Sequence, residues 1–441
     1  MTVLAHLPGA EALAAFYARF ANAVRDGHLA EAREPLIADV LRMAQAWVQA
    51  MPPAMAVPDL PAAGGLRAAL GPWLAMAETA YQQWVRSEAA DALIGAWTAG
   101  VAIPQGRHAA AMGAGEALGQ AALDAVGLPA EGMARTLIHA DGSARVYRYG
   151  DLLSTQSTPL LIVYAFVNRP SILDLAPDRS LIRGLVAAGR AVYLLDWGDP
   201  QPADAARSLE DYITGTLDRA VRVVGGRRAV DLLGVCQGGV LSLVYAAHRP
   251  RRVRRLITMV TPVDCRTPDD LLSHWIQPVA PMTWAMGSGQ VSGRLLDLAF
   301  QCLAPYRVGL GKVLDLIDHA ADPLWVQRFR RMERWVHDCP DQPGRAFAEF
   351  VRYFYQQNQL FNGTFVLAGR PLNLRQIQAP ILNVYGLHDH VVPPAASRAL
   401  AGLTDSKRYA ELAMPTGHIG IFVSARAIGL PAQLGAWLAR R

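Results

Sequence analysis

The alternation of short apolar segments with helical segments between residues 159 and 261 constrains the fold of this chain most strongly. Helical patterns such as SLIRGLVAAG and SLEDYITGTLDRAVRVV separate the apolar segments PLLIVYAF, AVYLLDW, AVDLLGV and RLITMVT. Strands that are apolar along nearly their whole length occur in parallel sheets with helices on both faces. APILNVYGL and YAELAMP continue the pattern nearer the C-terminus. The sequence therefore predicts an α/β fold.

The flanking segments predict the domain organisation. RTLIHA and SARVYRY lie on either side of Asp141-Gly142, a strong hairpin signal, so we expect the α/β domain to span residues 135–441. Residues 1–105 carry helical periodicity and predict an all-α N-terminal region, and the Gly- and Ala-rich residues 106–134 predict a connector. Residues from about 267 to 376 interrupt the strand pattern and are expected to form an inserted cap over the site.

The composition favours a folded cytosolic chain and excludes several functions. Hydrophobic residues make up 52% and the net charge of +5 is spread along the chain, which argues against disorder and nucleic-acid binding. The four cysteines form no CxxC pair, so neither a metal site nor a disulfide framework is expected. The N-terminus lacks a signal-peptide pattern. The apolar, uncharged run of residues 232–247 resembles a membrane span, but it is too short for one and is broken by Gly238-Gly239.

The strand AVDLLGV leads into Gly234-Val235-Cys236-Gln237-Gly238-Gly239 and then into a helix. This arrangement matches the G-x-S-x-G nucleophile elbow of the α/β-hydrolase fold, with a thiol in place of the hydroxyl. Gly234 and Gly238 are expected because side chains two residues before and after the nucleophile would clash in so tight a turn. A buried structural cysteine in a Gly-rich turn would give the same local pattern, so the partners decide.

Two further residues occupy the positions that the fold requires for catalytic partners. In this fold the acid follows a late strand and the histidine follows the last one. Asp389 follows ILNVYGL in LHDHVVPP, and His418 follows YAELAMP in PTGHIG. His390 is an alternative base, but it adjoins the acid, so we favour His418. Backbone N–H groups of Gln237 and Val167 are the candidate oxyanion donors.

Sulfur at the elbow indicates acyl transfer. A thioester on Cys236 can be formed from another thioester at nearly balanced energy, and its transfer to an alcohol is downhill. His418 would accept the thiol proton, and Asp389 would hold the imidazole tautomer. The three residues alone do not separate water from a hydroxyl group as the acceptor.

Seven segments in order resemble the catalytic subunit of class III polyhydroxyalkanoate synthases: VYAFVNRPSILDLAPDRSLIRGL, VYLLDWG, DYITGTLDRAV, LLGVCQGG, TMVTPVD, LHDHVVPP and GHIGI. The resemblance implies polymerisation of (R)-3-hydroxyacyl-CoA, such as 3-hydroxybutyryl-CoA, with release of CoA and growth of a polyester chain on Cys236. It implies His418 as general base, and Asp389 either as its partner or as activator of the 3-hydroxyl group. It also implies a homodimer at the surface of cytoplasmic polyester granules, with no cofactor beyond the CoA of the substrate.

The chain departs from that family at three places. Cys265 stands where the family tends to have an aromatic residue, and Thr416 where a glycine is usual before Gly417-His418. In addition, ETAYQQWVRSEAADALIGAW resembles the helical accessory subunit of the class, although a generic Ala-rich extension explains this segment equally well, and a separate accessory subunit stays a candidate partner. A cysteine thioesterase or esterase of the same fold, and a granule-coating protein with an inactive site, are the alternative functions.

Overall fold

The computed structural model describes residues 128–150, 158–279, 289–304, 311–405 and 407–440, with isolated positions between 19 and 86. The chain divides into two compact units: residues 1–129 with 298–337, and residues 130–297 with 338–441. The predicted boundary at residue 105 and most of the predicted connector lie outside the described residues. Residues of the expected cap insertion belong to both units.

The second unit is built on an eight-stranded sheet in the order β1-β2-β6-β3-β7-β8-β13-β14. β1 and β2 are antiparallel to their neighbours, and the strands from β6 to β14 pair in parallel. The strands are β1 (Arg135–Asp141), β2 (Ala144–Tyr149), β3 (Leu160–Val163), β6 (Val192–Asp196), β7 (Val230–Val235), β8 (Val253–Met259), β13 (Ile381–Gly386) and β14 (Tyr409–Met414). Every residue of β3, β7 and β13 is buried, so the predicted parallel sheet is confirmed.

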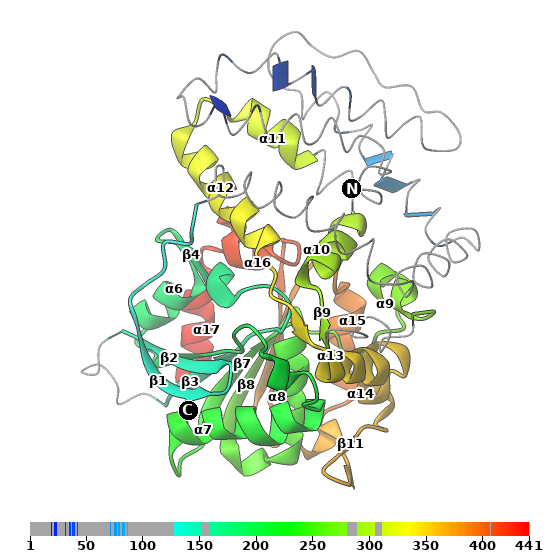
Figure 1. Ribbon diagram of the computed structural model, residues 1–441. Coiled ribbons are helices and arrows are strands. Elements are labelled where there is room, and N and C mark those ends of the chain that lie inside the picture. Colours follow the sequence, from blue (N-terminus) through cyan, green and yellow to red (C-terminus); the bar gives the residue numbers. More distant parts are fainter. Residues whose placement is uncertain are drawn as a thin grey trace. The chain divides into compact units, whose positions relative to one another are not determined.

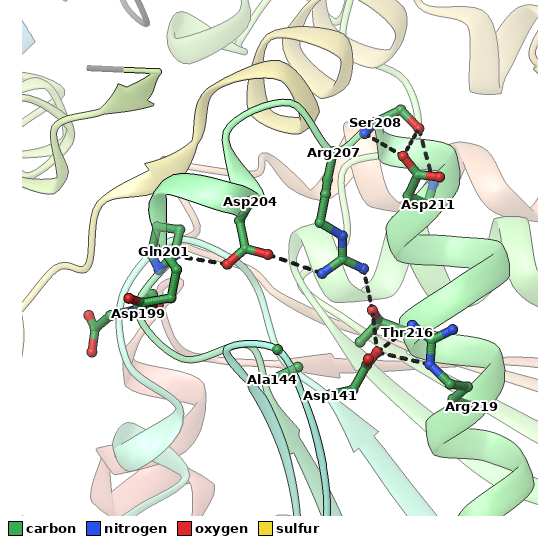
Figure 2. Close-up of polar contacts among 12 residues, drawn as sticks. Asp141, Ala144, Asp199, Gln201, Asp204, Arg207, Ser208, Asp211, Thr216 and Arg219 are labelled. Atoms are coloured by element: carbon green, nitrogen blue, oxygen red, sulfur yellow. Dashed lines mark hydrogen bonds and ion pairs between the residues drawn. The ribbon is translucent and has the colours of Figure 1, made fainter.

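The β1–β2 hairpin turns one residue later than its Asp-Gly signal suggests. Asp141 pairs with Ala144, so the two residues between them form the turn, with Gly142 at φ 61°. Asp141 stays on its strand and accepts hydrogen bonds from Thr216 Oγ1 and Arg219 Nε, each at 2.9 Å. Figure 2 shows these bonds, which join the hairpin to the helical segment after β6.

Helices cover the sheet on both faces (Figure 1). α6 (Leu181–Ala187) begins after Ser180, whose Oγ accepts from Arg183 N–H at 2.8 Å, and it packs on α17 (Leu430–Ala439). A π-helix, η5 (Asp211–Leu217), leads into α7 (Asp218–Gly225). α8 (Gln237–His248) is buried from Gln237 to Ala247 because it packs on the central strands β7 and β8.

The segment between β8 and β13 adds no strand to the large sheet in the part that the structure describes, and β8 pairs directly with β13. The described residues between these two strands therefore form an insertion in the order of the sheet. Its elements in the second unit are α9 (Leu271–Ile276), β9 (Gln290–Val291), β10 (Gln342–Pro343), α13 (Gly344–Phe350), the π-helix η9 (Val351–Gln356), α14 (Gln359–Asn362), β11 (Val366–Leu367), β12 (Arg370–Pro371) and η10 (Leu374–Gln376).

The short elements that remain in the second unit connect these layers. They are η3 (Pro170–Leu173), β4 (Asp174–Ala176), β5 (Arg179–Ser180), η4 (Pro202–Asp204), η6 (Pro250–Arg252), α15 (Pro394–Arg398), η11 (Ala399–Gly402), α16 (Gly420–Val423) and η12 (Ala425–Ala427). α10 (Gly293–Cys302) crosses the division between the units.

The first unit contains α11 (Lys312–Asp318) and α12 (Pro323–His337), joined by a buried ion pair. Lys312 Nζ lies 2.8 Å from Glu333 Oε2. Burial opposes ionisation of Glu333, but Lys312 and His337 outweigh it and lower the pKa of Glu333 to about 2. Among the described residues of either unit, no helix combines the length and the hydrophobicity needed to cross a lipid bilayer.

Candidate active site

Cys236 lies in a strained turn between the end of β7 and the start of α8. Its backbone has φ 52° and ψ −117°, a conformation that L-residues rarely adopt and that costs roughly 1–3 kcal/mol. A Cβ on Gly234 would come within 2.5 Å of Gly239 Cα, and one on Gly238 within 2.5 Å of Tyr164 O. The turn therefore excludes side chains at both glycines that the sequence singled out.

The loops after β13 and β14 bring Asp389 and His418 together. His418 Nδ1 lies 2.7 Å from Asp389 Oδ2, and both side chains are buried. The other carboxylate oxygen, Oδ1, accepts the N–H groups of Val391 at 2.9 Å and Val392 at 2.8 Å. Three groups, including the imidazole of His418, thus fix the Asp389 carboxylate.

The electrostatics of His418 favour the imidazolium form. Burial lowers the pKa of His418, but the charge of Asp389, the hydrogen bond to it, and the hydrogen bond and charge of Cys236 raise it to about 10. The structure therefore brings Cys236, His418 and Asp389 into one interacting set. A histidine between a thiol and a carboxylate can take up the thiol proton and stay charged beside the thiolate.

Val167 lies in the loop that follows β3, and this loop contacts the elbow through the side chain of Gln237. Gln237 Oε1 accepts the N–H of Phe166 at 3.1 Å and that of Val167 at 3.4 Å. The backbone N–H of Gln237 belongs to the first turn of α8, where N–H groups have no acceptor within the helix. Next in the loop, Asn168 has φ 62°.

Other buried groups near Cys236 escaped the sequence patterns. Tyr164 and Tyr355 are fully buried, and burial together with the charge of Cys236 raises the pKa of each phenol well above 10. Burial also raises the pKa of the Cys265 thiol. These three groups therefore stay neutral and protonated. They come from the loop after β3, from η9 and from the loop after β8, so no local sequence signal would have grouped them with the elbow.

Gln342 also lies near the site, and sequence analysis did not identify it. It is fully buried, and its Nε2 donates to Phe166 O at 3.1 Å and to Pro340 O at 2.7 Å. Within the described ranges, no group of three His, Cys, Asp or Glu side chains is arranged as a metal site.

Comparison with known proteins defines the class of this chain. A family model for the alpha/beta hydrolase fold matches residues 158–425, which include the elbow, Asp389 and His418. The chain is therefore a member of the α/β-hydrolase-fold family, in agreement with its sheet and its strand–turn–helix elbow.

Three relatives are named poly(3-hydroxyalkanoate) polymerase subunit PhaC. The protein of Allochromatium vinosum is 47% identical over 311 residues, which cover 69% of this chain and 88% of the relative. That of Thiocystis violacea is 44% identical over 310 residues, or 69% and 87%. That of Synechocystis sp. is 38% identical over 316 residues, or 69% and 84%. The chain belongs to the PhaC family of poly(3-hydroxyalkanoate) polymerases, and it is an acyltransferase.

Proposed function

We propose that this polymerase joins (R)-3-hydroxyacyl-CoA units, with 3-hydroxybutyryl-CoA as the representative substrate, through an acyl thioester on Cys236. The observation that carries the proposal is the buried His418–Asp389 pair, 2.7 Å apart, which interacts with a cysteine in a strained elbow. Membership of the PhaC family supports the choice of substrate.

In the acylation step, the Cys236 thiolate attacks the thioester carbonyl of the substrate. Oxyanion charge is stabilised by the N–H groups of Gln237 and Val167, and the bond between the acyl carbon and the CoA sulfur breaks. His418, protonated by the Cys236 thiol, returns its proton to the departing CoA thiolate. Asp389 supports the imidazolium, since its carboxylate lies 2.7 Å from the ring nitrogen.

In the transfer step, the 3-hydroxyl group of a second 3-hydroxyacyl unit attacks the carbonyl carbon of the thioester on Cys236. His418 takes the hydroxyl proton, an oxygen ester forms, and the released thiolate is reprotonated. We assign Asp389 to orienting His418, because both of its carboxylate oxygens are already engaged. The two steps together involve no oxidation or reduction and need no cofactor beyond the CoA of the substrate.

Acyl trapping on the thiol tests this function. The protein is mixed with 3-hydroxybutyryl-CoA and the reaction is quenched in acid. After digestion, the mass of the peptide that contains Cys236 is measured by mass spectrometry. We expect a 3-hydroxybutyryl adduct on Cys236, and a turbid solution with CoA release at longer times. Cys236→Ala should abolish both, whereas Cys265→Ala should keep both. Free 3-hydroxybutyrate without polymer would instead indicate a thioesterase, and full turnover by Cys236→Ala would refute the nucleophile.

We further propose that the protein works as a homodimer at the surface of cytoplasmic polyester granules. The product is a water-insoluble polyester, and the chain is apolar for its size, with 52% hydrophobic residues. An accessory subunit, or the N-terminal region in its place, would then contribute to assembly. Sedimentation of the full chain with and without substrate tests the dimer, and a monomer under turnover would contradict it.

A further inference from the structure

The backbone of Phe166 is held by two buried glutamine side chains that come from distant parts of the chain. On its amide side, Gln237 Oε1 accepts the N–H of Phe166 at 3.1 Å. On its carbonyl side, Gln342 Nε2 donates to Phe166 O at 3.1 Å. Gln237 is 6% exposed and Gln342 is 0% exposed, so water does not compete for either bond. Both peptide groups next to Phe166 are thus oriented by side chains.

The ring of Phe166 is held as firmly as its backbone. It packs against Trp197, with ring centroids 4.8 Å apart, and edge-on against Tyr212 at 5.1 Å. Trp197 Nε1 donates to Tyr164 O at 2.9 Å, and the Arg207 guanidinium lies over the Tyr212 ring at 4.3 Å. Figure 2 shows Arg207 fixed in turn by Asp204 and Thr216.

Polar contacts also fix the loop just beyond Val167. Arg169 forms ion pairs with Asp199 at 2.7 Å and with Asp338 at 3.2 Å. Burial raises the pKa of the nearby Cys339 thiol to about 12, and the backbone of Asn168 partly opposes this rise. Phe166 and Arg169, on either side of Val167, are therefore anchored, whereas among the described residues the Val167 N–H makes the long 3.4 Å contact with Gln237 Oε1.

We propose that the side chain of Gln237 is a positioning group that aims the Val167 N–H at the oxyanion, with Gln342 as its counterpart on the other side of Phe166. The inference rests on the proposed function, because it assigns a task to the oxyanion loop of that same site. Gln237 would then act twice: its backbone N–H donates to the oxyanion, and its side chain sets the second donor.

The two bond lengths explain how one acceptor can orient both N–H groups and still release one. The 3.1 Å bond to Phe166 has ordinary geometry and anchors the loop, whereas the 3.4 Å contact to Val167 is long and weak. A developing oxyanion is a stronger acceptor than a neutral amide oxygen, so it displaces the weaker contact. The Val167 N–H then reorients little, which keeps the donor preorganised.

Kinetics of three glutamine-to-methionine variants test this role. Methionine has nearly the length of glutamine but lacks the strong acceptor and donor. Removal of one oxyanion donor costs about 10²–10³ in kcat, so a misaimed donor should cost about 10- to 100-fold. We expect this loss in Gln237→Met and in Gln342→Met, with KM nearly unchanged. Gln433→Met, at an exposed site on α17, is the matched control and should keep the original kcat.

A second readout separates positioning from a merely structural role. 3-Hydroxybutyraldehyde would add to Cys236 as a hemithioacetal whose oxygen occupies the oxyanion position, whereas a thioether analogue of the substrate has no carbonyl oxygen. Gln237→Met should lose aldehyde affinity in proportion to kcat and keep its affinity for the thioether. Equal loss for both ligands would refute the positioning role.

The remaining outcomes distinguish this inference from the proposed function. Unchanged kcat in both Gln237→Met and Gln342→Met, with the acyl adduct still on Cys236, refutes the inference alone. Absence of the adduct and of aldehyde binding in the original protein refutes the proposed function. If Gln237→Met unfolds during purification, Gln342→Met alone decides, because it changes the same peptide group from the other side.

Discussion

Replacement of Asp389 with asparagine tests the charge relationship at the centre of the site. Asparagine keeps one oxygen for the N–H groups of Val391 and Val392, at 2.9 and 2.8 Å in the original protein. Its NH2 group then faces His418 Nδ1, where the carboxylate oxygen lay at 2.7 Å. That amide donates a hydrogen bond and selects the tautomer with the proton on Nε2, so the ring can no longer accept the Cys236 proton.

The size of the effect follows from the pKa of His418. Asp389 and Cys236 overcome the burial cost and raise this pKa from 6.5 to about 10. At 1.36 kcal/mol per unit, the rise is on the order of 5 kcal/mol, shared between the two partners. In a catalytic triad the wrong histidine tautomer alone costs about 10⁴ in kcat, so together with the lost charge we expect a decrease of about 10³–10⁴ in the acylation rate of Asp389→Asn.

Stopped-flow CoA release in a single turnover measures the acylation rate directly. Asp389→Glu is a suitable companion, since it keeps the charge but displaces it by one methylene. The reasoning is refuted if Asp389→Asn acylates within tenfold of the original rate while it remains folded.

The same pair predicts how stability depends on pH. The folded-state pKa of His418 is raised, so its contribution is complete below pH 6.5 and is lost as the pH rises through about 10. The unfolding midpoint of the original protein should therefore fall between pH 7 and 10 more steeply than that of Asp389→Asn. Parallel curves over this range would contradict the raised pKa.

Two further substitutions test the elbow and the first unit. Gly238→Ala should abolish activity and destabilise the fold by about 3 kcal/mol, because its Cβ would overlap Tyr164 O. Gly402→Ala is the control and should be neutral, because there is open space around Gly402. Equal midpoints of the two variants in thermal unfolding would contradict this reasoning. Lys312→Met should destabilise the protein by about 3 kcal/mol at pH 7, since it removes the ammonium group that lies 2.8 Å from the buried Glu333 carboxylate. The pKa of Glu333 is lowered to about 2, so this stabilisation is present above pH 4.5 and is lost as the pH falls toward 2; a midpoint that Lys312→Met leaves unchanged at pH 7 would refute it.

Much of the fold was predictable because its signals are local. Apolar strands and helical periodicity lie within the elements that they specify. The elbow is local as well: Gly234, Cys236 and Gly238 fall within five residues, and steric exclusion at both glycines follows from the turn itself. The order of Cys236, Asp389 and His418 along the chain likewise matches the order of nucleophile, acid and histidine in the α/β-hydrolase fold.

Only the tertiary structure decided which groups meet. The sheet order places β6 between β2 and β3, and it makes β8 a neighbour of β13 across the long insertion. Asp389 lies 2.7 Å from His418, 29 residues away, and Gln342 reaches Phe166 across 176 residues. Such contacts depend on how crossovers return the chain to the carboxyl edge of the sheet, and spacing along the sequence does not encode a distance in space.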